Sequence, residues 1–297
     1  MKMTDILIWL AILPSAVLIG RVLRLDKVEG EPIGLLVRTF LLGCLTCFPA
    51  AFLESIGDNL LMGLVSTRLG YSLGMYLVVV PLAEEGLKYL AMRNVRKNPA
   101  FNYTFDGIVY GVMASLGFAT LENLFYVLGL FDVGVAVARA FLSVPLHCVC
   151  GVFMGYYYGI AHRHKALGNQ SQARANSVLA LLVPMIIHGL YDFSLDTEDS
   201  LITLAGFAFT VVMFLLAINR VRTSSRNDEA FWGGYQPVVA PMMSPTAAPA
   251  APSVAASVAP SAVQQPQQEW QPVPDEWQSQ QPAAPIDDQS RSFNNKW

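Results

Sequence analysis

Residues 71–92 read YSLGMYLVVVPLAEEGLKYLAM and decide the fold of this chain. The segment is as long as the stretch of about 20 apolar residues that a helix needs to cross a bilayer. It nevertheless contains Glu84, Glu85 and Lys88. A charged side chain at the bilayer centre costs about 2.5 kcal/mol or more. Adjacent carboxylates in a spanning helix therefore predict a functional site that faces the bundle interior or a wet cavity.

Two further apolar segments carry short polar motifs at helical spacing. One is Phe118-x-x-x-Glu122-Asn123 and the other is His188-x-x-x-Asp192. Residues four apart share a helix face, so Asp192 is expected beside His188, where a carboxylate can fix the tautomer of a ligand or base. The simpler interpretation is a buried structural hydrogen bond. The chain has only 4 histidines, and two of them lie in apolar segments, which favours function.

His147 belongs to a third segment and is followed on its own helix face by Gly151-x-x-x-Gly155-x-x-x-Gly159. Another apolar segment carries a stripe of small residues, Gly107, Gly111 and Ser115. Small residues let a neighbouring helix approach closely, so the stripes predict tight packing and no chemistry of their own. His147 is therefore either part of the site or a core histidine bonded to a carbonyl oxygen.

The composition indicates an all-α membrane protein. Of the 297 residues, 54% are hydrophobic and 14% are charged, whereas a soluble domain has about 25% charged residues. The segments apolar enough to span a bilayer are roughly 4–23, 33–54, 71–92, 106–128, 138–161, 177–196 and 200–219. We therefore predict a polytopic transmembrane helical bundle of about seven spans, which forms one domain over residues 1–222.

Residues 223–297 differ from the rest of the chain and contain 11 of its 18 prolines. They bury too little apolar surface to offset the entropy of ordering, so we predict a disordered Pro/Ala/Gln-rich tail. Two similar triplets in this tail would suit a cytoplasmic partner, Glu269-Trp270-Gln271 and Glu276-Trp277-Gln278. The formal net charge of −3 gives no reason to expect a nucleic-acid partner.

Basic residues alternate between the connections and so indicate an orientation in the bilayer. They follow the first, third, fifth and seventh spans: Arg21, Arg24 and Lys27; Arg93, Arg96 and Lys97; Arg163, Lys165 and Arg174; Arg220, Arg222 and Arg226. Connections rich in Lys and Arg stay in the cytoplasm. The N-terminus is therefore expected outside and the tail in the cytoplasm, with a site near the midplane that opens outward.

Taken in this order, the motifs resemble those of the PrsW family of bacterial intramembrane proteases. The resemblance is carried by Glu84-Glu85-x-x-Lys88, Phe118-x-x-x-Glu122-Asn123, the His147 segment ending in Gly155-Tyr156, and His188-x-x-x-Asp192. That family belongs to a larger group with the CAAX-prenyl proteases and the bacteriocin-processing enzymes. The resemblance implies a multi-pass protein of the bacterial cell membrane and a metalloprotease. Its best-known members cut a single-span, membrane-anchored anti-sigma factor on the extracytoplasmic side and start a stress response.

The resemblance also implies roles for the residues of the site. Glu84 and Glu85 would activate water, with one of them as the base. Glu122 stands where the CAAX-type relatives carry a histidine, and His147 would supply the missing imidazole. The catalytic residues of the predicted site are Glu84, Glu85 and His188. A divalent metal, expected to be zinc, would be bound by Glu122, His147 and His188. The supporting residues are Lys88, Asn123 and Asp192. A Glu–His pair that activates water without a metal is the alternative.

Two other functions stay open from the sequence. A proton-coupled transporter also uses intramembrane Glu and His, but transporters often contain an internal repeat, and the Glu-Glu motif has no counterpart in later spans. A membrane scaffold would act through its tail. A protease requires that at least one glutamate and both His147 and His188 converge within about 4–8 Å, close enough to share a metal or one water.

Overall fold

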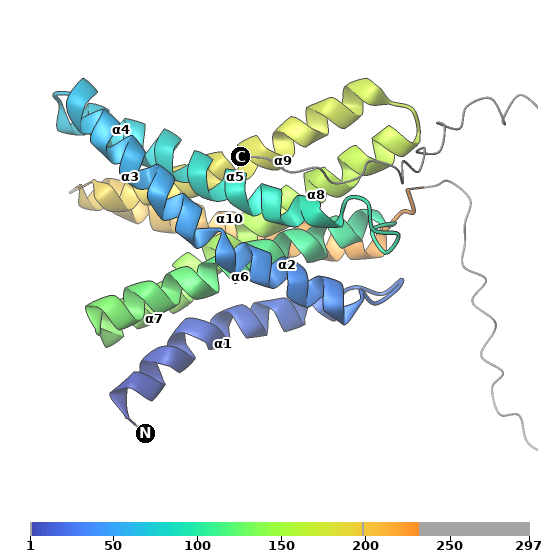
Figure 1. Cartoon of the computed structure of the whole chain (residues 1–297), viewed down its shortest axis with the longest axis horizontal. Helices are drawn as coiled ribbons and strands as arrows, with labels where there is room; N and C mark the ends of the chain where they lie inside the picture. The colour runs from blue at the N-terminus through green and yellow to red at the C-terminus, as the bar shows by residue number, and fades with distance from the viewer. Residues whose placement is uncertain (1, 198, 232–297) are drawn as a thin grey trace, which may run out of the picture. The chain divides into compact units, whose positions relative to one another are not determined.

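The computed structural model describes residues 2–197 and 199–231, and this part of the chain is almost entirely helical (Figure 1). In chain order the elements are α1 (Met3–Leu23), α2 (Ile33–Leu45), α3 (Cys47–Leu64), α4 (Arg68–Gly74), the π-helix η1 (Met75–Val79), α5 (Val80–Met92), the 3-10 helix η2 (Arg93–Val95), α6 (Thr104–Leu130), α7 (Val133–Phe141), α8 (Ser143–Ala166), α9 (Gln170–Asp196) and α10 (Ser200–Arg226). Within the described residues, the extended pairing is limited to an isolated bridge between Tyr103 and Ala230.

Six helical segments of the described part are long and apolar enough to cross a membrane. Four of them are α1, α6, α9 and α10. The other two are Ile33–Leu64, which joins α2 to α3, and Val133–Ala166, which joins α7 to α8. The remaining predicted span, residues 71–92, consists of α4, η1 and α5 in succession. The prediction of an all-α polytopic membrane bundle is confirmed, with that span divided into shorter pieces.

The division of this span occurs just before Pro81. Proline has no backbone N–H and its ring crowds the carbonyl group four residues earlier, so a regular α-helix cannot continue through it unchanged. The chain instead adopts a π-helix over Met75–Val79, which leads directly into α5. Single π-helical turns often occur at functional sites. Here the turn comes immediately before the segment that carries Glu84 and Glu85.

Helices α6 and α8 pack closely because their glycines face each other. A Cβ atom added at Gly107 would lie 2.4 Å from the carbonyl oxygen of Gly155, and one added at Gly111 would lie 2.4 Å from that of Gly151. The two predicted stripes of small residues thus form one helix–helix contact, in which the backbones themselves touch. This contact sets the register of α6 against α8.

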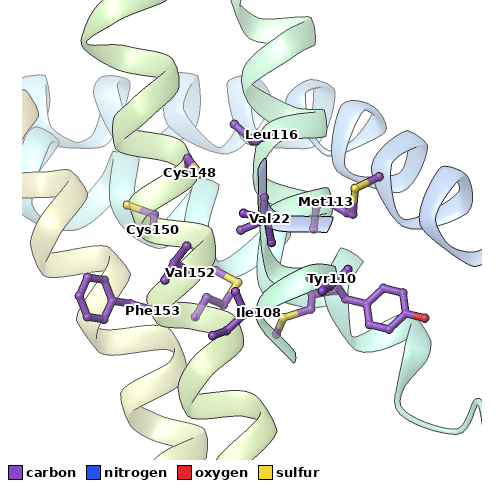
Figure 2. Close-up of a cluster of buried hydrophobic side chains, with 14 of the residues drawn as sticks. Val22, Ile108, Tyr110, Met113, Leu116, Cys148, Cys150, Val152 and Phe153 are labelled. Atoms are coloured by element: carbon purple, nitrogen blue, oxygen red, sulfur yellow. The ribbon is translucent and has the colours of Figure 1, made fainter. Parts of the chain in front are cut away.

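The main hydrophobic core surrounds this contact (Figure 2). Buried side chains in the close-up come from α6, α8 and α1, and include Ile108, Leu116, Val152 and Val22. The outer helices instead expose large apolar side chains, among them Trp9, Leu13, Phe52, Leu60, Val211 and Leu215. An exposed apolar surface of this kind is stable when hydrocarbon is the solvent, as for a helical membrane protein.

Replacing Gly155 by alanine is expected to destabilise the bundle by about 1–3 kcal/mol, the usual range for overpacking. The new Cβ would lie 2.0 Å from the carbonyl oxygen of Gly107, so α6 and α8 must separate. Thermal unfolding in detergent measures the change. Gly20→Ala in α1 is the matched control, since nothing lies within 4 Å of a Cβ there. Equal unfolding temperatures for the two variants would contradict the packing argument.

The bundle continues past residue 222, where the sequence places the domain boundary. Helix α10 ends at Arg226. Beyond it, Phe231 is buried and donates its backbone N–H to the carbonyl oxygen of Asn102 at 2.8 Å. The first residues of the predicted tail therefore pack beside the start of α6. Residues 232–297, which include both tryptophan triplets, lie outside the described residues.

Candidate active site

The polar motifs meet at one place inside the bundle. Glu84 and Glu85 come from α5, His147 from α8 and His188 from α9. All four residues are buried, each offers one ligand atom, and these atoms lie within 4.8 Å of one another. The convergence that a hydrolytic site requires is therefore present.

His147 is oriented by contacts on both ring nitrogens. Its Nδ1 lies 2.9 Å from Lys88 Nζ and its Nε2 lies 3.0 Å from Glu122 Oε2. An ammonium group can only donate, so Nδ1 accepts from Lys88, and Nε2 carries the proton that points to Glu122. The backbone is held as well, because Ser115 Oγ donates to the carbonyl oxygen of His147 at 2.6 Å. Glu122 thus fixes the tautomer whose Nδ1 lone pair faces the cluster.

His188 has a matching arrangement. Its Nε2 lies 3.2 Å from Asp192 Oδ2, so the predicted contact one helical turn away is present. Its Nδ1 lies 2.8 Å from Glu85 Oε1 and 3.8 Å from Glu84 Oε2. Both histidines therefore turn Nδ1 toward the centre of the cluster and Nε2 toward an outer carboxylate.

A close helix contact brings His188 to the glutamates. The next residue, Gly189, faces the π-helix, where an added Cβ would lie 2.7 Å from the carbonyl oxygen of Tyr76 and 3.0 Å from Pro81 Cγ. Only glycine fits at that distance without a shift of α9. The π-helical turn and Gly189 together place α9 against the start of α5, so His188 reaches Glu85.

The cluster adjoins a cavity of about 850 Å³. Glu84, His147 and His188 line this cavity, together with the outer carboxylates Glu122 and Asp192. Glu85 has no exposed surface and is absent from the described residues that form the wall. Water or a substrate in the cavity can therefore reach Glu84, whereas Glu85 lies behind it.

Glu122 lies outside the group of four, on the far side of His147. Its Oε2 is also 2.7 Å from Arg139 Nη2. Arg139 in turn donates from Nε to Asn123 Oδ1 at 2.6 Å, so Asn123 touches the cluster only through other residues. This position suits a carboxylate that orients His147 better than one that binds the metal directly.

The sequence does not single out Glu54, although its side chain lines the same cavity. Glu54 stands at the end of the predicted span 33–54, where a carboxylate would reach water at little cost. Helix α3 continues instead to Leu64, which places Glu54 well inside an apolar segment. If the predicted span had extended ten residues further, to Leu64, Glu54 would have been a carboxylate inside a spanning helix. Such a carboxylate is costly and therefore indicates a functional residue.

The residues present suit a divalent transition metal such as zinc. Catalytic zinc sites combine three histidine or carboxylate ligands with an open position for water. Glu85, His147 and His188 supply one carboxylate and two imidazoles, the ligand types found in such sites. Metal-binding histidines commonly donate their other ring N–H to a carboxylate, as both histidines can do here to Glu122 and Asp192. In addition, Glu85 Oε2 is buried and has no hydrogen-bond partner within the described part of the chain. A cation in the cluster would satisfy this oxygen.

Comparison with known proteins identifies the family. The model of the PrsW family intramembrane metalloproteases matches residues 31–218. The chain belongs to this family. It is accordingly an intramembrane protease and a multi-pass membrane protein of the kind found in bacteria.

Curated relatives agree with this assignment. Protease PrsW of Bacillus subtilis (strain 168) is 36% identical over 186 residues, which cover 62% of this chain and 80% of the relative. Protease PrsW of Oceanobacillus iheyensis is 31% identical over 220 residues, or 73% and 94% of the two chains. Protease PrsW of Clostridioides difficile (strain 630) is 30% identical over 231 residues, or 75% and 94%. No solved structure matches the chain.

Removing either outer carboxylate is expected to slow cleavage by about 10–100-fold, the usual effect of losing the partner of a metal-binding histidine. The variants Glu122→Gln and Asp192→Asn keep the shape but accept less strongly from His147 and His188. Initial rates and metal content should fall together. Asp58→Asn is the matched control, because Asp58 accepts from Tyr71 and contacts no histidine. Unchanged rates in both variants would exclude the orienting role.

Proposed function

We propose that the chain hydrolyses a peptide bond in a single-span, membrane-anchored protein. The observation that carries this proposal is the group of two glutamates and two histidines whose ligand atoms lie within 4.8 Å of one another, three of which line a cavity inside a helical membrane protein. Peptide hydrolysis needs a base for water and groups that stabilise the charge on the carbonyl oxygen. This cluster contains residue types for both tasks.

Glu84 is the proposed base, because it is the glutamate of the pair that lines the cavity. Its carboxylate takes a proton from water as the water oxygen bonds to the carbonyl carbon. It then gives the proton to the leaving nitrogen as the C–N bond breaks. Glu85, His147 and His188 are the proposed ligands of a divalent metal, with zinc as the first candidate. When bound, such an ion would polarise the peptide carbonyl group and lower the pKa of water.

The position of the cavity supports cleavage on the extracytoplasmic side. Its wall includes Arg139 near the end of α7, Asp196 at the end of α9, and Phe207 in the first half of α10. These elements adjoin connections that are poor in basic residues, whereas the basic residues gather at the opposite helix ends. By the positive-inside rule the cavity faces outward, with the N-terminus outside and the tail in the cytoplasm.

An anti-sigma-factor-like protein is the proposed substrate class. Such a protein crosses the bilayer once, so its chain can enter the cavity from the membrane. The resemblance of the motifs to PrsW proteases first suggested this class, and the curated relatives share the name Protease PrsW. Membership of a protease family weighs against the alternative function of a proton-coupled transporter. The other alternative, a membrane scaffold, would act through the tail, most of which lies outside the described residues.

Reconstitution with a defined substrate tests the proposal. The full chain is placed in liposomes with a single-span anti-sigma factor that carries tags on both sides of the bilayer. We expect two fragments, cut at or near the outer surface, and loss of cutting after treatment with 1,10-phenanthroline. Added zinc should restore activity. Intact substrate under all conditions would contradict the proteolytic function for this substrate class, and cutting that survives the chelator would contradict the metal.

Truncation after Phe231 is expected to leave the cleavage rate unchanged within about twofold, since surface changes away from a site usually have small effects. The truncated chain keeps α1–α10 and the contact of Phe231 with the start of α6. The assay is the one above, with the rate divided by the amount of inserted protein. If the truncation abolished function while Glu84 variants kept it, the membrane scaffold would be the better proposal.

A further inference from the structure

Lys88 stands at the centre of the ligand group. Its Nζ lies 2.8 Å from Glu84 Oε2, 2.8 Å from Glu85 Oε1 and 2.9 Å from His147 Nδ1. The side chain has no exposed surface, and Nζ lies 4.1 Å from the centre of the Phe118 ring. An ammonium group has three N–H donors, and here each donor has its own acceptor.

These three acceptors belong to three of the four residues that can together hold a metal. The Nδ1 of a neutral imidazole has a single lone pair, so His147 cannot accept from Lys88 and coordinate a metal ion through this nitrogen at the same time. The charges conflict as well, because a divalent cation within a few ångström of a buried ammonium group is strongly repelled. Lys88 in this position and a metal ion held by Glu85, His147 and His188 therefore exclude each other.

Without a cation, the centre of the cluster would be unstable. Glu84 and Glu85 are adjacent and buried, and unpaired carboxylates in a membrane interior are costly. Lys88 compensates this charge from one turn further along α5, where its spacing of four and three residues brings Nζ to both carboxylates. Its side chain is a flexible four-carbon stem, so the ammonium group can move when a competitor arrives.

We propose that Lys88 and a divalent metal ion are alternative occupants of the same ligand set. Lys88 holds the ligands together in the metal-free protein and is displaced when the ion binds. The metal affinity of the wild type is then lowered by the work of displacing an ammonium group that has three hydrogen bonds. This inference rests on the metal of the proposed function and adds a residue that controls its binding.

Metal binding by Lys88→Met tests the exchange, because methionine has a similar length and no charge. Purified protein in detergent is dialysed against Co²⁺ and against Zn²⁺, and the Co²⁺ absorption spectrum reports the ligand set. We expect the variant to bind about tenfold or more tightly than the wild type, since a repelling charge is gone. Arg220→Met is the matched control: Arg220 is also a partly buried cation, but it donates to Tyr156 Oη and lines a different cavity. Its affinity should stay close to that of the wild type.

Thermal unfolding provides a second readout. Metal-free Lys88→Met should unfold at a lower temperature than the wild type, and added metal should raise its unfolding temperature more than that of the wild type. A role of Lys88 in packing alone would lower stability without any gain in affinity. Should Lys88→Met fail to fold, Lys88→Gln replaces it. Equal or weaker metal binding by the neutral variant would overturn the exchange.

Failure of the exchange and failure of the proposed function give different results. If the wild type cleaves its substrate and neither protein takes up metal, the exchange is overturned and hydrolysis by the glutamates and histidines stands. If Lys88→Met gains affinity and the wild type cleaves nothing, the exchange is supported and the proposed substrate class is wrong.

Discussion

Replacing Glu84 by glutamine is expected to lower the rate of peptide hydrolysis by about two to four orders of magnitude, the range that general acid–base catalysis contributes. Glutamine has nearly the same shape and can still accept from Lys88 Nζ, which lies 2.8 Å from Glu84 Oε2. It cannot take a proton from water. The protein should therefore insert and fold as before, and the loss should appear in kcat more than in KM.

The neighbouring Glu85→Gln variant separates the base from a ligand. Glu85 is fully buried behind the cavity wall, and its Oε1 contacts both Lys88 and His188 at 2.8 Å. We expect Glu84→Gln to keep the proposed metal, because the three proposed ligands Glu85, His147 and His188 are unchanged. Glu85→Gln should lose the proposed metal as well as activity. Metal content measured on both proteins decides the assignment. An active Glu84→Gln variant would transfer the role of base to Glu85.

Contacts within single helices could be predicted from the sequence, because helical spacing alone determines them. Glu84 and Lys88 are separated by four positions in the sequence, and Lys88 Nζ lies 2.8 Å from Glu84 Oε2 in the structure. His188 and Asp192 have the same spacing and lie 3.2 Å apart. In both pairs the reason is the repeat of 3.6 residues per turn, which stacks positions i and i+4 on one face.

Contacts between helices required the structure. Glu122 lies behind His147 because α6 and α8 are held in one register by backbone contacts such as Gly111 against Gly151. The stripes of small residues indicate that helices pack closely, but they do not say which helix is the neighbour or at what height. For the same reason the sequence led us to count Glu122 among the metal ligands, whereas the four residues whose ligand atoms converge are Glu84, Glu85, His147 and His188.

The backbone conformation before Glu84 and Glu85 is a further feature that the sequence could not predict. By residue count, Glu84 and Glu85 fall slightly on the cytoplasmic side of the midplane, whereas His188 lies near the midplane and Glu122 and His147 lie in the outer half of their spans. This mismatch in depth is on the order of 10 Å at a rise of about 1.5 Å per residue. The structure brings Glu85 to 2.8 Å from His188. The π-helix Met75–Val79 contributes to this fit, and periodicity cannot reveal it, since an apolar run looks the same in α- and π-helical form.

Replacing His188 by alanine is expected to reduce the cleavage rate to the background measured without enzyme, and to abolish metal binding. The imidazole contacts Glu85 and Asp192, and His188 lines the cavity. Its loss takes away a ligand and removes the hydrogen bond that His188 makes to Asp192, while Glu85 keeps only its contact with Lys88. An unpaired buried polar group costs about 1–3 kcal/mol, so the variant should also unfold at a lower temperature.

His164→Ala is the matched control, because His164 lies in the last turn of α8 and contributes to a different cavity, with Arg163 and Arg220. Its cleavage rate and zinc content should equal those of the wild type. Adding imidazole to His188→Ala distinguishes chemistry from folding: a folded variant with a vacant ring position should regain part of its activity, whereas a misfolded one should not. Full activity in His188→Ala would mean that His147 and the glutamates suffice, and that His188 has only a structural contact with Glu85.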